Sequence, residues 1–217
     1  QVHIDGGFAP ESIMVRNNFI LPDLGLSNED HGYALFIGRL SDEKGADTLL
    51  RAWTENRLPM PLRIVGSGPA EVALKTLVAG YANISFLGHL DKASVLQQLA
   101  QASFLVMPSR TYETFGRTIV EAYSRGKPVI ASRLGAMAEL VQDGVTGFLF
   151  DPANPADLAA AAMKFIQLDE TKKQHMRLAA RAATLARGRL KTHLLRRCPW
   201  DAARGADSAS VRSAHLG

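Results

Sequence analysis

The sequence holds a single cysteine, Cys198, so the chain cannot form an internal disulfide or a cysteine-rich zinc site. Its six histidines show no metal-ligand spacing, and no metal site is predicted. No apolar run approaches the ~18 residues that a membrane span needs. The chain also opens without the pattern of a secretory leader. These absences favour a cytoplasmic protein over a secreted or membrane-spanning one.

Basic charge is scarce outside one short stretch of the chain. Residues 187–217 hold 7 Lys/Arg and 2 Asp/Glu, whereas residues 1–186 hold 18 basic and 19 acidic side chains. The formal net charge of +4 therefore belongs to the end of the chain. A nucleic-acid-binding domain more often spreads basic residues over one face. We interpret the excess as a solvated basic tail, and we expect no nucleic-acid partner.

Short apolar runs alternate with helical patterns through most of the sequence. The runs are nearly continuous in apolar residues, which is typical of strands covered on both faces. The expected strands lie at 34–38, 62–66, 84–88, 104–108, 128–132 and 147–150. The expected helices lie at 45–57, 69–80, 91–101, 116–126, 136–142, 155–168 and 170–187. This order predicts an α/β, Rossmann-like, doubly wound parallel sheet with right-handed crossovers.

The same pattern divides the chain into three parts. Residues 1–33 are less regular and are interpreted as a linker and entry segment, with a possible short strand at 12–16. Residues 34–187 form the predicted domain. Residues 188–217 form the basic tail, which is expected to be irregular because it has few large apolar side chains. Ligands of a doubly wound domain bind beyond the carboxyl ends of the strands.

The loop after the first expected strand runs from Gly38 to Gly45 and carries two cations, Arg39 and Lys44. Glycines let a backbone turn tightly and approach a ligand. A guanidinium binds phosphate oxygens as a fork, and an ammonium acts beside it as a point charge. The loop is therefore either an anion site or a surface loop with two solvated cations.

The loop after the second strand reads Gly66-Ser67-Gly68-Pro69. It matches part of a dinucleotide fingerprint, but Glu71 stands where the third glycine would be, and no phosphate-binding Lys-Ser/Thr follows. A tight strand-to-helix turn is the stronger interpretation, and a turn beside a ligand is the alternative.

The loop after the fourth strand, residues 108–116, leads into a helix that opens near Gly116. The free N–H groups and the dipole of a helix start favour an anion. Glu113 lies in the loop just before this start, and Glu121 is expected more than one turn inside the helix. The two carboxylates are either solvated or placed to accept hydrogen bonds from the diols of a ligand.

Six segments in this order resemble the C-terminal domain of glycosyltransferase family 4, the group 1 glycosyltransferases of the GT-B fold. The segments are FIGRLSDEKGADTLL (36–50), IVGSGP (64–69), NISFLGHL (83–90), MPSRTYETFGRTIVEA (107–122), GKPVIAS (126–132) and ELVQDGVTGFLF (139–150). Glu113 and Glu121 fit the family's E-x(7)-E element. The resemblance covers roughly residues 12–187.

The resemblance implies retaining transfer of a sugar from a nucleoside-diphosphate sugar, with no cofactor and no divalent metal. It places Arg39, Lys44 and Glu113 in the catalytic set, where the two cations hold the diphosphate and Glu113 binds sugar hydroxyls. Glu121 would bind the ribose diol. The other donor-binding positions that it implies are Gly38, Gly66, Gly68, Leu87, Phe115, Gly116, Arg117 and Thr118.

The family's enzymes have two domains, and the acceptor and a catalytic histidine usually belong to the N-terminal one. We therefore expect a missing N-terminal domain, an acceptor that is a glycan, a lipid or a small molecule, and a peripheral membrane location at most. A donor-binding fragment without transferase activity of its own is the main alternative. A dinucleotide-dependent oxidoreductase and a purely structural domain are weaker alternatives.

Overall fold

The computed structural model describes residue 7, residues 23–113 and residues 116–195, and for residues 186–195 it describes the backbone alone. The expected short strand at 12–16 and the predicted donor-binding residue Phe115 lie outside these ranges. The described part of residues 1–33, which is residue 7 and residues 23–33, contains neither a helix nor a strand.

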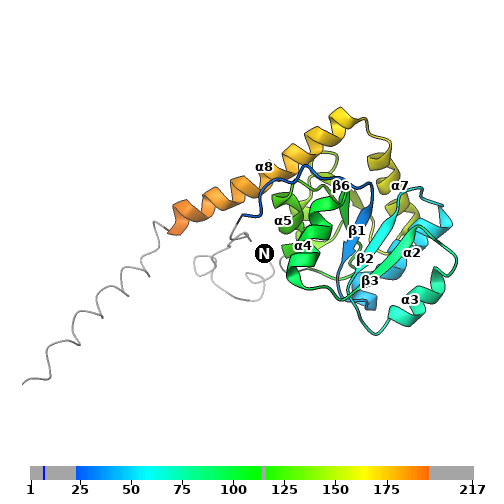
Figure 1. The fold of residues 1–217 in the computed structure, drawn as a ribbon. Helices are drawn as coiled ribbons and strands as arrows, with labels where there is room; N and C mark the ends of the chain where they lie inside the picture. The colour runs from blue at the N-terminus through cyan, green and yellow to red at the C-terminus, as the bar shows by residue number, and fades with distance from the viewer. Residues whose placement is uncertain (1–6, 8–22, 114–115, 196–217) are drawn as a thin grey trace, which may run out of the picture.

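A six-stranded parallel sheet forms the centre of the domain, in the order β3-β2-β1-β4-β5-β6 (Figure 1). Its strands are β1 (Ala34–Ile37), β2 (Leu62–Val65), β3 (Ile84–Gly88), β4 (Phe104–Met107), β5 (Val129–Ser132) and β6 (Gly147–Phe150). All six lie within one residue of the expected ranges. The prediction of a doubly wound, Rossmann-like sheet is confirmed.

Helices cover both faces of the sheet, which is why the strands are apolar on both sides. In β1, Phe36 packs into the core beneath α2 (Ala46–Glu55), α3 (Glu71–Leu77) and α7 (Pro155–Ile166). Its neighbour Leu35 packs into the opposite core, beneath α4 (Lys92–Gln101), α5 (Arg117–Ser124) and α6 (Gly135–Leu140). Successive side chains of a strand point to opposite faces, so one short strand supplies both cores.

Two helices begin with side-chain caps. Asp91 accepts a hydrogen bond from the Ser94 N–H over 2.8 Å at the start of α4. Asn154 accepts one from the Asp157 N–H over 3.1 Å, and Pro155 occupies the first turn of α7. Each cap satisfies a backbone donor that has no partner inside the helix.

The last helix, α8 (Glu170–Leu195), corrects the expected boundary at residue 187. Residues 188–195 continue the helix, although they were expected to begin an irregular tail. Leucine, arginine and lysine are good helix formers, and one glycine costs only about 1 kcal/mol in a helix. Met176 and Ala180 of this helix are buried against the two cores. No described helix is both long enough and apolar enough to cross a membrane.

A group of four cations holds residues 23–29 against the domain, and we call it the cationic clamp. Three of its members donate to backbone carbonyls of this segment, whereas Arg181 pairs with the Asp23 carboxylate and donates to Ser124 O. The other bonds are Arg125 to Leu24 O (2.5 Å), Lys127 to Glu29 O (2.5 Å) and Arg177 to Ser27 O (2.7 Å). Burial lowers the pKa of the Lys127 ammonium to about 8.

The direction of the strand order reverses between β1 and β4, which are neighbours in the sheet. The chain winds from β1 through β2 to β3 on one side, and from β4 through β5 to β6 on the other. The carboxyl ends of β1 and β4 therefore flank the switch point, where open α/β sheets bind their ligands. The two loops that leave these ends build the candidate site.

Candidate functional site at the switch point

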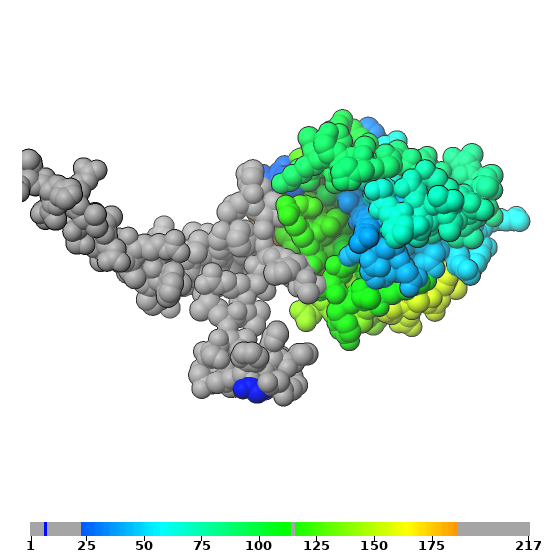
Figure 2. Space-filling model, turned by 90° about the horizontal axis from the view of Figure 1, so that it is seen from below, coloured from blue at the N-terminus to red at the C-terminus, as the bar shows by residue number. Residues whose placement is uncertain are grey.

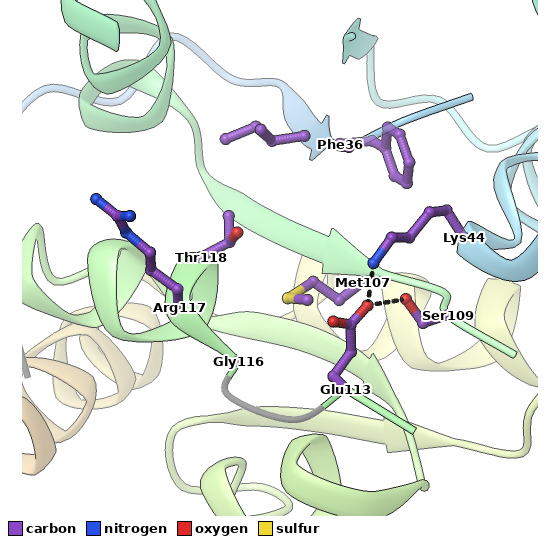
Figure 3. A pocket seen from close by; sticks show the side chains of 10 residues that line it. Phe36, Lys44, Met107, Ser109, Glu113, Gly116, Arg117 and Thr118 are labelled. Carbon is purple, nitrogen blue, oxygen red and sulfur yellow. Dashed lines mark hydrogen bonds and ion pairs between the residues drawn. The ribbon is translucent and has the colours of Figure 1, made fainter. Parts of the chain in front are cut away.

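The loop after β1 ends in a 3-10 turn, η2 (Asp42–Lys44). Gly45 closes the turn at φ 66° and leads directly into α2. Inside the loop the Ser41 hydroxyl donates to the Glu43 carboxylate over 2.6 Å, and this bond lowers the pKa of Glu43. Lys44, at the end of the turn, extends its side chain toward the loop after β4 (Figure 3).

The loop after β4 places Glu113 before the start of α5. Gly116 caps this helix at φ 54°, a left-handed conformation that glycine adopts without the steric cost of a Cβ. The first N–H groups of α5, beginning at Arg117, have no partners within the helix. Together with the helix dipole they favour an anion at this point.

Between the two loops lies a pocket of about 260 Å³. Figure 2 looks onto this end of the molecule, where the surface is hollowed between its blue and green parts. Figure 3 shows the side chains that surround it. The lining residues are Phe36, Ile37, Gly38, Lys44, Met107, Ser109, Glu113, Gly116, Arg117 and Thr118.

Lys44 and Glu113 form an ion pair across the pocket, with 2.5 Å between Lys44 Nζ and Glu113 Oε1. The same carboxylate oxygen accepts a hydrogen bond from the Ser109 hydroxyl over 2.8 Å. The Glu113 side chain is 19% exposed and that of Lys44 is 31% exposed. The pocket thus presents a fixed ammonium, a fixed carboxylate and a helix N-terminus to one small volume, which suits a ligand that carries both an anion and hydroxyl groups.

The structure brings together six of the residues predicted for the site: Gly38, Lys44, Glu113, Gly116, Arg117 and Thr118 all line the pocket. Arg39 is exposed at the start of the loop after β1 and does not line the pocket. Leu87 packs against the core near the end of β3. Glu121 lies on α5 with 14% of its side chain exposed, and it accepts a hydrogen bond from Arg117 Nε over 3.1 Å.

Gly66 and Gly68 lie behind the loop after β1, where their lack of a side chain lets two backbones touch. A Cβ on Gly66 would lie 1.9 Å from Gly38 O, and one on Gly68 would lie 2.4 Å from Leu40 O. The tight-turn interpretation of this loop is therefore supported by a specific contact. Its glycines support the loop that carries Lys44 and do not line the pocket.

Four other residues line the pocket although the sequence predicts no site role for them: Phe36, Ile37, Met107 and Ser109. Phe36, Ile37 and Met107 lie in the strands themselves, where an apolar residue predicts the core equally well. The signal for Ser109 was its position directly after a strand end. Arg110 was also missed: it pairs with Asp42 and Asp47 of the neighbouring loop region, which a single sequence does not reveal.

A family model described as "Glycosyl transferases group 1" matches residues 31–167. An uncharacterised glycosyltransferase of Methanocaldococcus jannaschii is 34% identical over 78% of this chain and 48% of its own length. A GDP-mannose-dependent alpha-mannosyltransferase of Corynebacterium glutamicum is 33% identical over 67% of this chain and 33% of its own length. The chain thus spans half or less of the length of these relatives.

Solved structures agree in fold. Anabaena HepE in complex with UDP-glucose superposes with a TM-score of 0.65 at 27% identity, over 79% of this chain and 50% of that one. The catalytic domain of the cholesterol-alpha-glucosyltransferase from Helicobacter pylori has a TM-score of 0.63 at 22% identity, over 71% of this chain and 98% of that one. With the family match over more than half of the sequence, the chain belongs to the group 1 glycosyltransferases, and its sheet is that of a C-terminal GT-B domain.

Proposed function

We propose that this chain is the donor-binding part of a retaining glycosyltransferase and that it holds a nucleoside-diphosphate sugar in the switch-point pocket. The observation that carries the proposal is the Lys44–Glu113 pair, which faces the N-terminus of α5 inside one pocket. A diphosphate needs fixed positive charge, and a sugar needs hydrogen-bond acceptors for its hydroxyls. The pocket offers both within a few ångströms.

The proposed chemistry follows from where charge develops. When the bond between the sugar and the diphosphate breaks, negative charge accumulates on the departing phosphate oxygens. The Lys44 ammonium and the N–H groups of Gly116, Arg117 and Thr118 stabilise that charge because they are already in place. Arg39, at the mouth of the same loop, supplies a second cation. Glu113 exchanges its bond with Lys44 for bonds to sugar hydroxyls when the donor enters.

The rest of the donor is assigned to positions around this centre. Glu121 accepts hydrogen bonds from the ribose diol, and the base lies toward Leu87. Gly66 and Gly68 support the loop after β1 from behind. UDP-glucose is bound by the Anabaena relative, which makes UDP the first nucleotide to test. GDP is the second, since a similar mannosyltransferase uses GDP-mannose.

The proposal divides the activity between two parts of a longer enzyme. This chain spans only 48% of the length of its archaeal relative, and the acceptor is assigned to an N-terminal GT-B domain. The alternative function, donor binding without transfer by this chain alone, follows from the same observation. It predicts nucleotide binding with no sugar transfer to any acceptor until an N-terminal domain is added.

Calorimetric titration of the chain with UDP, GDP, ADP and NAD, without added metal, tests the proposal. We expect one nucleoside diphosphate to bind and NAD not to bind. The Arg39→Ala/Lys44→Ala double variant should lose that binding. The matched control is Lys172→Ala/Lys173→Ala, which removes two cations from α8. Binding of NAD alone, or equal binding by the wild type and the first double variant, would contradict the proposal.

A further inference from the structure

We propose that Arg110 is a positioning residue that holds Lys44 against Glu113 by binding the loop after β1 to the loop after β4. The inference rests on the proposed function, because the position of the Lys44 ammonium matters only if it meets a ligand in the pocket. Arg110 itself does not line the pocket. Its effect on a ligand therefore has to pass through the residues that it holds.

The contacts of Arg110 surround Lys44 in the sequence. Its Nη1 pairs with Asp42 and its Nη2 pairs with Asp47, while Nη2 also donates to the Thr48 hydroxyl over 2.9 Å. The Arg110 backbone N–H donates to Glu43 O over 2.9 Å. One residue of the loop after β4 thus binds the turn that contains Lys44 and the start of α2 after it.

The two ion pairs of Arg110 differ in burial, so they are expected to hold the loop after β1 with different strength. The Arg110 side chain is 27% exposed and that of Asp47 is 33% exposed, whereas Asp42 is 89% exposed. A partly buried pair is screened less by water and salt than an exposed one. The pair with Asp47, which anchors the first turn of α2, is therefore expected to matter more than the pair with Asp42.

The chemistry of arginine suits this bridge better than that of lysine. A guanidinium presents its N–H groups in a rigid fork, so it can hold two carboxylates at fixed angles at once. The Arg110 Nε is buried with no hydrogen-bond partner among the described residues, which is a cost the bridge has to offset. A lysine at this position would reach one carboxylate at a time.

The loop has a second anchor beside Arg110. A Cβ on Gly45 would lie 2.0 Å from Pro108 O, so the end of the turn touches the chain just before Ser109. The backbone contact fixes how closely the loops approach, and Arg110 fixes the turn that precedes Lys44. Because Asp42 and Asp47 balance its charge, Arg110 adds little positive field of its own to the pocket.

The first test is a double-mutant cycle on UDP affinity, measured by calorimetry on the full chain. We expect Arg110→Met to weaken UDP binding about tenfold. A loss of this size lies within the range of interaction free energies found between contacting residues. In a Lys44→Met background the same change should have less than about a twofold effect, since the residue through which it acts is gone. Arg110→Lys should fall between the wild type and Arg110→Met.

Arg181→Met is the matched control for loss of a structural cation. Arg181 also joins two segments through a carboxylate and a backbone carbonyl, but it does so in the cationic clamp. It should lower the melting temperature and leave UDP affinity unchanged. Additive effects of Arg110→Met and Lys44→Met would overturn the positioning role, and so would an equal loss of affinity in Arg181→Met.

The second test needs no nucleotide and therefore separates this inference from the proposed function. Trace acetylation with acetic anhydride, read by mass spectrometry, reports the reactivity of Lys44 relative to the exposed Lys172. We expect Arg110→Met and Glu113→Gln both to raise the acetylation rate of Lys44 relative to that of Lys172. Arg181→Met should leave this ratio unchanged. A wild-type chain that binds no nucleoside diphosphate would refute the proposed function. An unchanged Lys44 ratio in folded Arg110→Met would refute the role of Arg110.

Discussion

Gly66 lies so close to Gly38 that a Cβ on Gly66 would stand 1.9 Å from the Gly38 carbonyl oxygen. The contact joins the ends of two neighbouring strands, because the N–H of Gly38 in turn donates to Val65 O over 3.0 Å. The loop that carries Lys44 is therefore supported from behind by backbone alone. A side chain at position 66 would force the loop after β1 away from the end of β2.

Gly66→Ala should destabilise the domain and weaken nucleotide binding together. Its φ of 135° is costly for alanine, by about 1–3 kcal/mol, and the contact with Gly38 O adds a clash with backbone. Gly80→Ala is the matched control, since Gly80 also has a positive φ (94°) but has open space around its would-be Cβ. Urea unfolding measures the free energy of unfolding of both variants. Equal losses of this free energy would show that the backbone at Gly38 can move away from a side chain at position 66.

Lys127 should make the stability of the domain rise with pH between about 8 and 10.5. Burial lowers its pKa to about 8 in the folded chain, against 10.5 for a free side chain. Between these values the unfolded chain holds a proton that the folded chain has released, so the free energy of unfolding increases by up to about 3 kcal/mol. Below pH 8 both states carry the proton, and this residue contributes no slope.

The measurement is chemical unfolding at several pH values for the wild type, Lys127→Met and Lys164→Met. Lys164 is exposed on α7, so its replacement should leave the slope as in the wild type. Only Lys127→Met should remove the rise of the free energy of unfolding above pH 8. Parallel curves for the wild type and Lys127→Met would mean that water reaches this ammonium in the folded chain.

The fold could be predicted from the sequence because each strand is short, apolar on both faces and followed by a turn. Runs such as FLVM at 104–107 leave little choice other than a buried strand, and Asp91 and Asn154 give two helix starts directly. The end of α8 was misplaced because the sequence near 187 changes in composition and not in helix propensity. Composition indicates exposure, but it does not by itself end a helix.

The proximity of residues at the candidate site could be predicted in part, and what could not be predicted has a physical reason. Lys44 and Glu113 follow strand ends, which topology brings to one edge, so their proximity could be expected. The Arg110 contacts with Asp42 and Asp47 could not, because they depend on how two loops pack over one another. Gly66 was recognisable as a turn residue, whereas its close approach to Gly38 needed coordinates.

Loss of either cation of the loop after β1 should weaken nucleoside-diphosphate binding. We expect Lys44→Ala and Arg39→Ala each to cost about 1.5–3 kcal/mol, the usual scale of a hydrogen bond to a charged group. Lys44 lines the pocket and Arg39 is exposed beside it, so raised salt should reduce the contribution of Arg39 more. Calorimetry at two ionic strengths measures this, and unchanged affinity in both variants would contradict the phosphate assignment.

Glu121 should distinguish a nucleotide from its phosphate part. Its side chain is mostly buried on α5 and bonded to Arg117, whose own side chain is 71% exposed and lines the pocket. If Glu121 binds the ribose diol, Glu121→Ala should weaken UDP by about 1.5–3 kcal/mol. The same change frees the Arg117 guanidinium, so pyrophosphate should bind equally well or more tightly.

The comparison needs UDP and pyrophosphate titrations on the wild type, Glu121→Ala and Glu170→Ala. Glu170 is 88% exposed at the start of α8, and its loss should alter neither affinity. A parallel loss of UDP and pyrophosphate in Glu121→Ala would mean that this carboxylate acts on the phosphate region, by holding Arg117 in place. Weaker UDP binding with unchanged or tighter pyrophosphate binding would assign Glu121 to the nucleoside part of UDP, which carries the ribose diol and is absent from pyrophosphate.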